Sequence, residues 1–123
     1  MENIRTHKDL LIWQKSIDFV VEVYGITNLF PKSELFALTN QIRRCVTSIP
    51  ANIAEGSGRK GNKEFVQFLH IALGSSTELE TFLIISKKLN YINDNIFEKL
   101  NEQLSEIIRM LIGLIKSLNK NNT

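Results

Sequence analysis

The chain has 123 residues, of which 43% are apolar and 23% charged, and its formal net charge is +2. These values are typical of one globular domain and exclude a largely disordered chain. The single cysteine excludes an internal disulfide framework and suits a reducing compartment. No apolar run is long enough to span a membrane, and the N-terminal segment lacks the apolar core of a signal peptide. We therefore expect a cytoplasmic protein with no membrane contact.

Apolar residues recur at steps of three and four along four segments, which is the spacing of amphipathic helices. No alternating pattern typical of a β-strand separates these segments. The predicted helices cover residues 8–26, a stretch from 31–33 to 56, residues 62–90 and residues 95–118. Four long helices with short connections predict an all-α fold, an antiparallel up-down-up-down four-helix bundle. We expect one domain over residues 1–123, with frayed ends at 1–7 and 119–123.

Local signals predict how these helices begin and bend. Thr6 and Asp9 have the spacing of a capping box at the start of the first helix. Pro50 lies inside the apolar pattern of the second helix, so we expect a kink there. Asn62 is a suitable N-cap for the third helix. The small residues 74–76 in the middle of that helix would let a neighbouring helix approach closely.

The last predicted helix is apolar on two adjoining faces. One row keeps an unbroken three-four spacing: Phe97, Leu100, Leu104, Ile107, Leu111, Leu114 and Leu118. Ile108, Ile112 and Ile115 form a second row beside it. A helix with two apolar faces is either central in its bundle or touches another subunit. The second row therefore motivates a scaffold hypothesis, in which an apolar helix face binds a protein partner.

A basic stretch, residues 41–63, joins the second and third predicted helices. It holds five basic side chains and one acid, Glu55, so its local excess is four positive charges, whereas the whole chain nets +2. We expect these cations to gather at one end of the bundle. The glycines of the stretch have two interpretations. Either the amides that open the third helix bind a phosphate together with the cations, or the glycines only allow left-handed backbone angles at a tight turn.

Arg43 and Arg44 are neighbours on the second predicted helix, so their side chains project about 100° apart. We expect one of them to pair with a helix acid such as Glu55, Glu78 or Glu80. The other would then meet solvent or a partner. The sequence leaves open which arginine has which role.

No set of residues meets the usual criteria for catalysis. Residues 56–61 match the glycine pattern of dinucleotide-binding loops, but a helix rather than a strand precedes them. The nearest match to the Glu-x-x-His motif of di-iron bundles is Gln67 with His70, and glutamine is not the anion that bridges such metals. Cys45 lies on an apolar helix face, where a thiol is usually inert packing. We expect no enzyme activity, no metal and no small-molecule cofactor.

Six motifs follow one another in an order that resembles a known family. They are Asp9-Leu10-x-x-Trp13-Gln14-Lys15, Phe30-Pro31-x-x-Glu34, Gln41-Ile42-Arg43-Arg44, Ser48-Ile49-Pro50-x-Asn52-Ile53-Ala54-Glu55-Gly56-x-Gly58-Arg59, Glu64-Phe65-x-x-Phe68-Leu69-x-Ile71-Ala72-x-Gly74-Ser75 and Glu78-Leu79-Glu80-Thr81. The series resembles the bacterial intervening-sequence proteins, four-helix bundles whose genes occur within insertions in large-subunit ribosomal RNA. The resemblance covers about residues 9–91, and the last helix matches in pattern only.

The resemblance implies a ring-like homopentamer. It also implies kinship with the accessory proteins of diversity-generating retroelements, which have the same shape and bind nucleic acid. We therefore hypothesise a non-enzymatic, oligomeric protein that binds nucleic acid, structured RNA in the first place and DNA as the other option, through basic residues at one end of the bundle. The candidate contacts are Arg43, Arg44, Arg59, Lys60 and Lys63, with Lys87 and Lys88 as a second patch.

Overall fold

The computed structural model describes residues 6–120, and these residues form four α-helices and no β-strand. The predicted all-α class is therefore confirmed. In chain order the elements are the 3₁₀ turn η1 (His7–Asp9), α1 (Leu11–Thr27), the 3₁₀ turn η2 (Lys32–Glu34), α2 (Leu38–Ser57), α3 (Asn62–Lys88) and α4 (Asp94–Lys120). The predicted frayed ends lie largely outside the described residues, but 119 and 120 still belong to α4.

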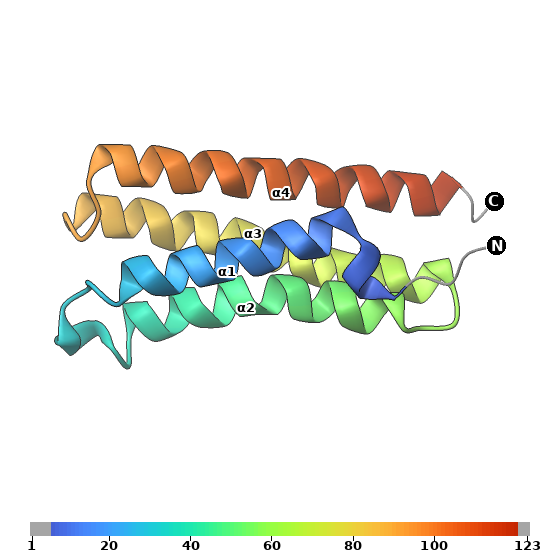
Figure 1. The fold of residues 1–123 in the computed structure, drawn as a ribbon, viewed down its shortest axis with the longest axis horizontal. Coiled ribbons are helices and arrows are strands. Elements are labelled where there is room, and N and C mark those ends of the chain that lie inside the picture. The colour runs from blue at the N-terminus through green and yellow to red at the C-terminus, as the bar shows by residue number, and fades with distance from the viewer. Residues whose placement is uncertain (1–5, 121–123) are drawn as a thin grey trace.

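The four helices lie side by side along one long axis (Figure 1). Each helix packs against the next one in the chain, and α1 also packs against α4, which closes the bundle. The α2–α3 turn and the C-terminal end of α4 lie at one end of the bundle. The α1–α2 loop and the α3–α4 turn lie at the other end. This arrangement decides which of the basic residues come together.

The core contains one apolar stripe from each helix, because the three-four spacing places these residues on one face. The largest fully buried side chains are Phe19, Ile42, Ile49, Ile53, Leu69, Leu79, Leu100, Leu104, Ile107, Leu111, Val23 and Val46. α2 continues as a helix through Pro50, which is itself buried. The stripes of α2, α3 and most of α4 are those that the spacing predicted. In α1 the prediction is wrong, because Ile12, Phe19 and Val23 are buried whereas Trp13 and Ile17 are only partly buried.

The first two long helices begin later than predicted. Thr6 and Asp9 do form a capping box, but it caps η1, and α1 begins only at Leu11. Residues 32–34 form η2 rather than the first turn of α2. Ala37 is the N-cap of α2, and the Glu34 carboxylate in η2 accepts a hydrogen bond from the amide of Leu38, the first helical residue, over 3.3 Å.

α2 and α3 approach each other closely at two of the three small residues that were predicted to allow it, Ser75 and Ser76, but not at Gly74. Ser76 is fully buried, and the Oγ atoms of Ser48 and Ser75 lie 2.8 Å apart across the two helices. Gly74 is different, since a Cβ added there would meet nothing within 4 Å. Gly74 therefore faces open space, and the prediction that it admits a neighbouring helix is wrong for this residue.

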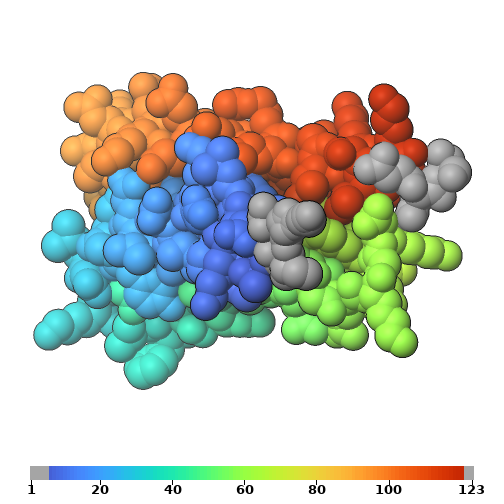
Figure 2. All heavy atoms as spheres, turned by 45° about the vertical axis from the view of Figure 1, so that its right-hand side comes forward, coloured from blue at the N-terminus to red at the C-terminus, as the bar shows by residue number. Residues whose placement is uncertain are grey.

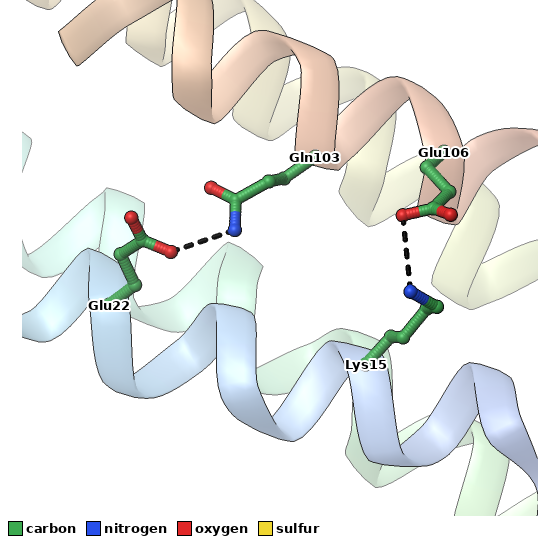
Figure 3. Close-up of polar contacts among 4 residues, drawn as sticks. All are labelled: Lys15, Glu22, Gln103 and Glu106. Carbon is green, nitrogen blue, oxygen red and sulfur yellow. Dashed lines mark hydrogen bonds and ion pairs between the residues drawn. The ribbon is translucent and has the colours of Figure 1, made fainter.

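The contact between α1 and α4 is lined by polar side chains (Figure 3). The Lys15 ammonium lies 3.4 Å from a Glu106 carboxylate oxygen, and the Gln103 amide donates a hydrogen bond to Glu22 over 2.8 Å. Lys99 forms a second ion pair with Glu22 at 2.9 Å. Burial raises the pKa of Glu22, but the hydrogen bonds and the positive charge of Lys99 outweigh it, so the net pKa is lowered.

Candidate nucleic-acid interface

The turn between α2 and α3 consists of residues 58–61. Gly58 ends α2 with φ −86°, and Gly61 precedes α3 with φ −147°. No glycine among residues 6–120 has a positive φ, so the interpretation that these glycines supply left-handed angles is wrong. A Cβ added to Gly61 would meet nothing within 4 Å. The backbone of the turn is therefore open to an incoming group.

Three cations surround this turn. Arg59 forms an ion pair with Glu55 and lies over the ring of Phe68, with its Cζ 4.9 Å from the ring centroid. Lys60 and Lys63 are exposed, and neither has a partner in the part of the chain that the structure describes. The yellow-green side chains of this region project beyond the body of the bundle in Figure 2. The exposed Arg59–Glu55 ion pair contributes little to stability, so Arg59 can exchange its partner. All three cations are therefore accessible to an anion.

The first turn of α3 adds backbone donors to these cations. Gly61 rather than the predicted Asn62 is the N-cap, and no side chain caps the helix. The first amides of a helix have no partner within the helix, and they lie at the positive end of its dipole. Glu64 supplies one opposing negative charge in this turn. Uncapped amides beside two unpaired lysines therefore form a candidate anion site.

Arg43 has a structural role. Its Nε donates to Thr27 Oγ1 over 3.0 Å, and its Nη2 donates to Asn28 Oδ1 over 2.9 Å. Its Cζ also lies 4.6 Å from the centroid of the Tyr24 ring. These three contacts tie α2 to the C-terminal end of α1. Arg43 is thereby removed from the candidate interface.

Arg44 points instead to solvent and hydrogen-bonds Gln41 over 3.4 Å. Neither arginine forms an ion pair within residues 6–120, so the predicted pairing with a helix acid is wrong. The reason for Arg43 is geometric, because its guanidinium is occupied by Thr27 and Asn28 at the end of α1.

The predicted basic residues do not gather at one end. Arg43 and Arg59 are 16 positions apart in α2 and its cap, which is about 24 Å along a helix axis. Lys87 and Lys88, which were predicted as a separate patch, lie at the far end of α3 from Lys63. The expectation of a single basic cluster is therefore wrong, and only residues 59, 60 and 63 lie together.

The second predicted patch is weaker than the first. Lys87 lies 3.8 Å from a carboxylate oxygen of Asp94 and 4.7 Å from the centroid of the Phe97 ring. Lys88 is exposed and has no partner within residues 6–120. One residue that the sequence reasoning missed is the exposed Lys116, in the last turns of α4, at the same end of the bundle as the α2–α3 turn. The opposite directions of α3 and α4 would have indicated it.

The apolar face expected on α4 is not free. Ile115 is only 6% exposed and belongs to the core, and Ile108 packs against that core. Only Ile112 of the predicted second row is exposed. A scaffold surface on α4 is therefore not supported by the structure.

An apolar surface is found instead on α1 and α2. A shallow groove of about 360 Å³ between these helices is lined almost entirely by apolar groups. Its walls are His7, Trp13, Ile17, Val20, Thr47, Pro50, Ala51 and Ala54. Beyond it, the α1–α2 loop exposes Leu29 and Phe36, at 81% and 91%. We call the groove and these two loop residues the α1–α2 apolar surface.

The composition of α1 explains why this surface exists. The helix has three charged residues, and two of them, Lys15 and Glu22, are paired with α4. The third, Asp18, lines a small cavity on the same side together with Gln103 and Glu106. The polar side of α1 thus faces α4. Apolar residues are left to face outward, as in a helix that is covered by another chain.

Cys45 is suited to packing rather than to catalysis. It is 5% exposed. Burial, together with the nearby Glu78 carboxylate, raises the pKa of its thiol to about 12. A thiol with this pKa is a poor nucleophile at neutral pH. No group of three or more His, Cys, Asp and Glu residues suited to a metal ion occurs among the described residues.

Among residues 6–120, one helix, α3, is long and apolar enough by composition to cross a membrane. In this structure α3 packs between α2 and α4, and its stripe from Val66 to Ser86 is buried there. The exposed apolar residues on its outer side include Ile71, Ile84 and Ile85.

The fold and the basic turn define a four-helix bundle with a small cationic site at one end. A sequence model of the 23S rRNA-intervening sequence protein family matches residues 8–113. The chain therefore belongs to this family, as the motif series predicted. No curated protein matches the chain.

A similar solved structure is the crystal structure, at 1.70 Å resolution, of a protein of unknown function from the S23 ribosomal protein family of Bacteroides thetaiotaomicron VPI-5482. The two sequences are 32% identical, and the superposition has a TM-score of 0.80. The match covers 86% of this chain and 99% of that one. Most of the bundle is thus similar in the two proteins.

Proposed function

We propose that this protein is a non-enzymatic oligomer that binds structured RNA through the α2–α3 turn of each subunit. The observation that carries the proposal is the pair of exposed, unpartnered lysines, Lys60 and Lys63, beside the uncapped amides of α3. Cations and helix N-termini are the groups that proteins use for phosphate. The name of the family connects it to ribosomal RNA, which favours RNA over DNA.

The charge of one subunit is small, so we infer that several subunits act together. The turn combines Arg59, Lys60 and Lys63 with the acids Glu55 and Glu64, a local excess of one positive charge. Repeating such a site in a homopentamer raises the effective affinity by roughly 10²–10⁴-fold when the geometry permits simultaneous contact. The α1–α2 apolar surface supports self-association, because exposed apolar patches of this kind mark interaction sites.

The α1–α2 apolar surface also supports a second candidate function, a scaffold that binds another protein. Phe36 is 91% exposed and belongs to an apolar surface of the kind that marks interaction sites. The mass of the protein in solution distinguishes the two functions. A stable oligomer uses the surface for self-association, whereas a strict monomer leaves it to a foreign partner.

Charge reversal tests the proposed RNA contact. We expect the double variant Lys60→Glu and Lys63→Glu to lose at least about tenfold in affinity for an RNA hairpin, since two phosphate contacts are replaced by repulsion. The matched control is Lys32→Glu with Arg109→Glu, which makes the same change in net charge at two exposed residues away from the turn. Equal losses in both variants, with fold and mass unchanged, would contradict a specific role for the turn.

A further inference from the structure

A polar notch lies between α2 and α3, away from the basic turn. Its volume is about 140 Å³, the room of four or five water molecules at roughly 30 Å³ each. It is lined by Gln41, Arg44, Cys45, Ser48, Ser75 and Glu78. Among these, Arg44 and Glu78 are exposed, and the two serines are partly buried.

Opposite charges face the notch from its two sides without meeting. Arg44 is on α2 and Glu78 is on α3, and no ion pair joins them in the described part of the chain. Among residues 6–120 the Arg44 guanidinium makes one hydrogen bond, to Gln41 over 3.4 Å, so most of its N–H groups are unused. The notch therefore offers donors on the α2 side and a carboxylate acceptor on the α3 side.

The serine pair adds one more donor. Asn52 Nδ2 donates to Ser48 Oγ over 2.9 Å and to the Ser48 carbonyl over 2.8 Å. The hydroxyls of Ser48 and Ser75 share one hydrogen bond of 2.8 Å. Two hydroxyl hydrogens are present and this bond uses one of them. The other hydroxyl hydrogen has no described partner and is available at the wall of the notch.

These groups suit a base better than a phosphate. Glu78 repels a phosphate, but its carboxylate accepts hydrogen bonds from adjacent N–H donors. Guanine offers such N–H donors on its Watson–Crick edge, and it has the acceptors O6 and N7 that arginine recognises. Single-stranded bases in RNA are read on these edges. Adenine and uracil lack this combination of two adjacent N–H donors with a flanking acceptor pair.

We propose that the notch reads a guanine base in a single-stranded segment of bound RNA, an inference that rests on the proposed function. Arg44 donates to O6 and N7, Glu78 accepts from the base N–H groups, and a serine hydroxyl contributes a further donor. Arg44 and Arg59 are 15 positions apart, about 22 Å along α2. The turn thus positions the RNA backbone while the notch selects a base, which is the usual division between phosphate and base contacts.

The test compares single-stranded oligouridylates of equal length with one central guanine or one central adenine. We expect the guanine oligomer to bind at least about fivefold more tightly in a fluorescence-anisotropy titration. Glu78→Gln removes this preference, whereas the matched control Glu80→Gln removes the same charge from another face of α3 and keeps it. The Lys60→Glu and Lys63→Glu variant weakens both oligomers equally.

The outcomes separate this proposal from the proposed function. Binding of both oligomers without a guanine preference overturns the notch proposal and leaves RNA binding intact. If neither oligomer binds, RNA binding is contradicted, and GMP and AMP are titrated while the amide signals of Gln41, Ser75 and Glu78 are followed by NMR. Shifts with GMP alone support the notch, because both nucleotides carry the same phosphate. Equal or absent shifts overturn it.

Discussion

Gly56 lies directly against Phe68, so that a Cβ added to Gly56 would be 2.7 Å from the Phe68 Cβ. The same Cβ would be 2.9 Å from a ring carbon of Phe65. These contacts are shorter than real Cβ atoms make, and the Phe68 Cβ cannot move without the α3 backbone. The absence of a side chain at residue 56 therefore sets how closely α2 approaches α3, just before the basic turn.

We expect Gly56→Ala to lower the free energy of unfolding by about 1–3 kcal/mol, because the extra methyl overpacks this contact. The matched control is Gly74→Ala, also inside a long helix, where the added Cβ meets nothing within 4 Å. That control should be stabilised by about 0.5–1 kcal/mol from helix propensity alone. Urea unfolding measures both, and equal effects of the two substitutions would contradict the close α2–α3 contact.

Arg43 and Arg44 should separate stability from binding. Arg43→Gln removes the hydrogen bonds to Thr27 and Asn28 and is expected to cost about 1–2 kcal/mol, with little change in RNA affinity. Arg44→Gln should change stability by less than about 0.5 kcal/mol, as for other exposed side chains. Thermal unfolding and RNA titration of both variants check this assignment. If Arg44→Gln lowered the stability and Arg43→Gln did not, the structural role would belong to Arg44 instead.

The Cys45 thiol makes stability depend on pH at the alkaline end. Its pKa is raised to about 12 in the folded chain from 9.0 in the unfolded one, so the folded state holds the proton more tightly. The protonated thiol therefore contributes to the free energy of unfolding. This contribution is complete below pH 9 and is lost as pH rises toward 12. We expect the urea midpoint of the wild type to fall between pH 8.5 and about pH 10.5 by more than that of Cys45→Ala, which lacks the thiol.

The same pKa predicts slow alkylation of the folded protein. At pH 8 the thiolate fraction is about a thousandfold smaller at pKa 12 than at pKa 9. Iodoacetamide should therefore modify the folded chain at least about a hundredfold more slowly than the chain in urea. Similar rates in the two states would show that Cys45 is exposed and ionised.

Self-association should depend on the α1–α2 apolar surface. Ala51 is exposed in the wall of its groove, so Ala51→Glu places a charge there without disturbing the core. We expect wild-type protein to have several times the 14.1 kDa of one chain by light scattering, and the variant to be monomeric and folded. Gln67→Glu, an exposed change on α3, is the control and should remain oligomeric. An oligomer that survives Ala51→Glu would exclude this surface as the interface.

The periodicity of apolar residues predicted most of the fold, and its failure near the end of α4 has a simple cause. The strict three-four pattern continues from Leu111 to Leu114, but the buried residue is Ile115. A straight α-helix has 3.6 residues per turn and drifts from a seven-residue repeat by about 20° per heptad. The core-facing stripe therefore passes from the first predicted row to the second toward the end of α4.

The candidate site was only partly predictable, because its members depend on helix length and on distant partners. The stretch 41–63 is continuous in sequence, yet α2 places Arg43 about 24 Å from Arg59. The partners of Arg43 are Thr27 and Asn28, at the end of another helix. The number of charges in a stretch of sequence reveals neither the distance between Arg43 and Arg59 nor the partners of Arg43. It did identify Arg59, Lys60 and Lys63, since these flank a turn and remain together in any fold.

The most direct test of the account is a titration of purified protein against a labelled RNA hairpin and a DNA duplex of equal length, over a range of salt concentrations. The account predicts tighter binding to RNA and a steep loss of affinity with salt. Two unpaired lysines from one subunit give a slope of log K against log salt near −2, so a slope steeper than about −3 indicates several subunits on one RNA. Absence of binding at low salt, or equal binding to both nucleic acids with a shallow slope, would contradict the central claim.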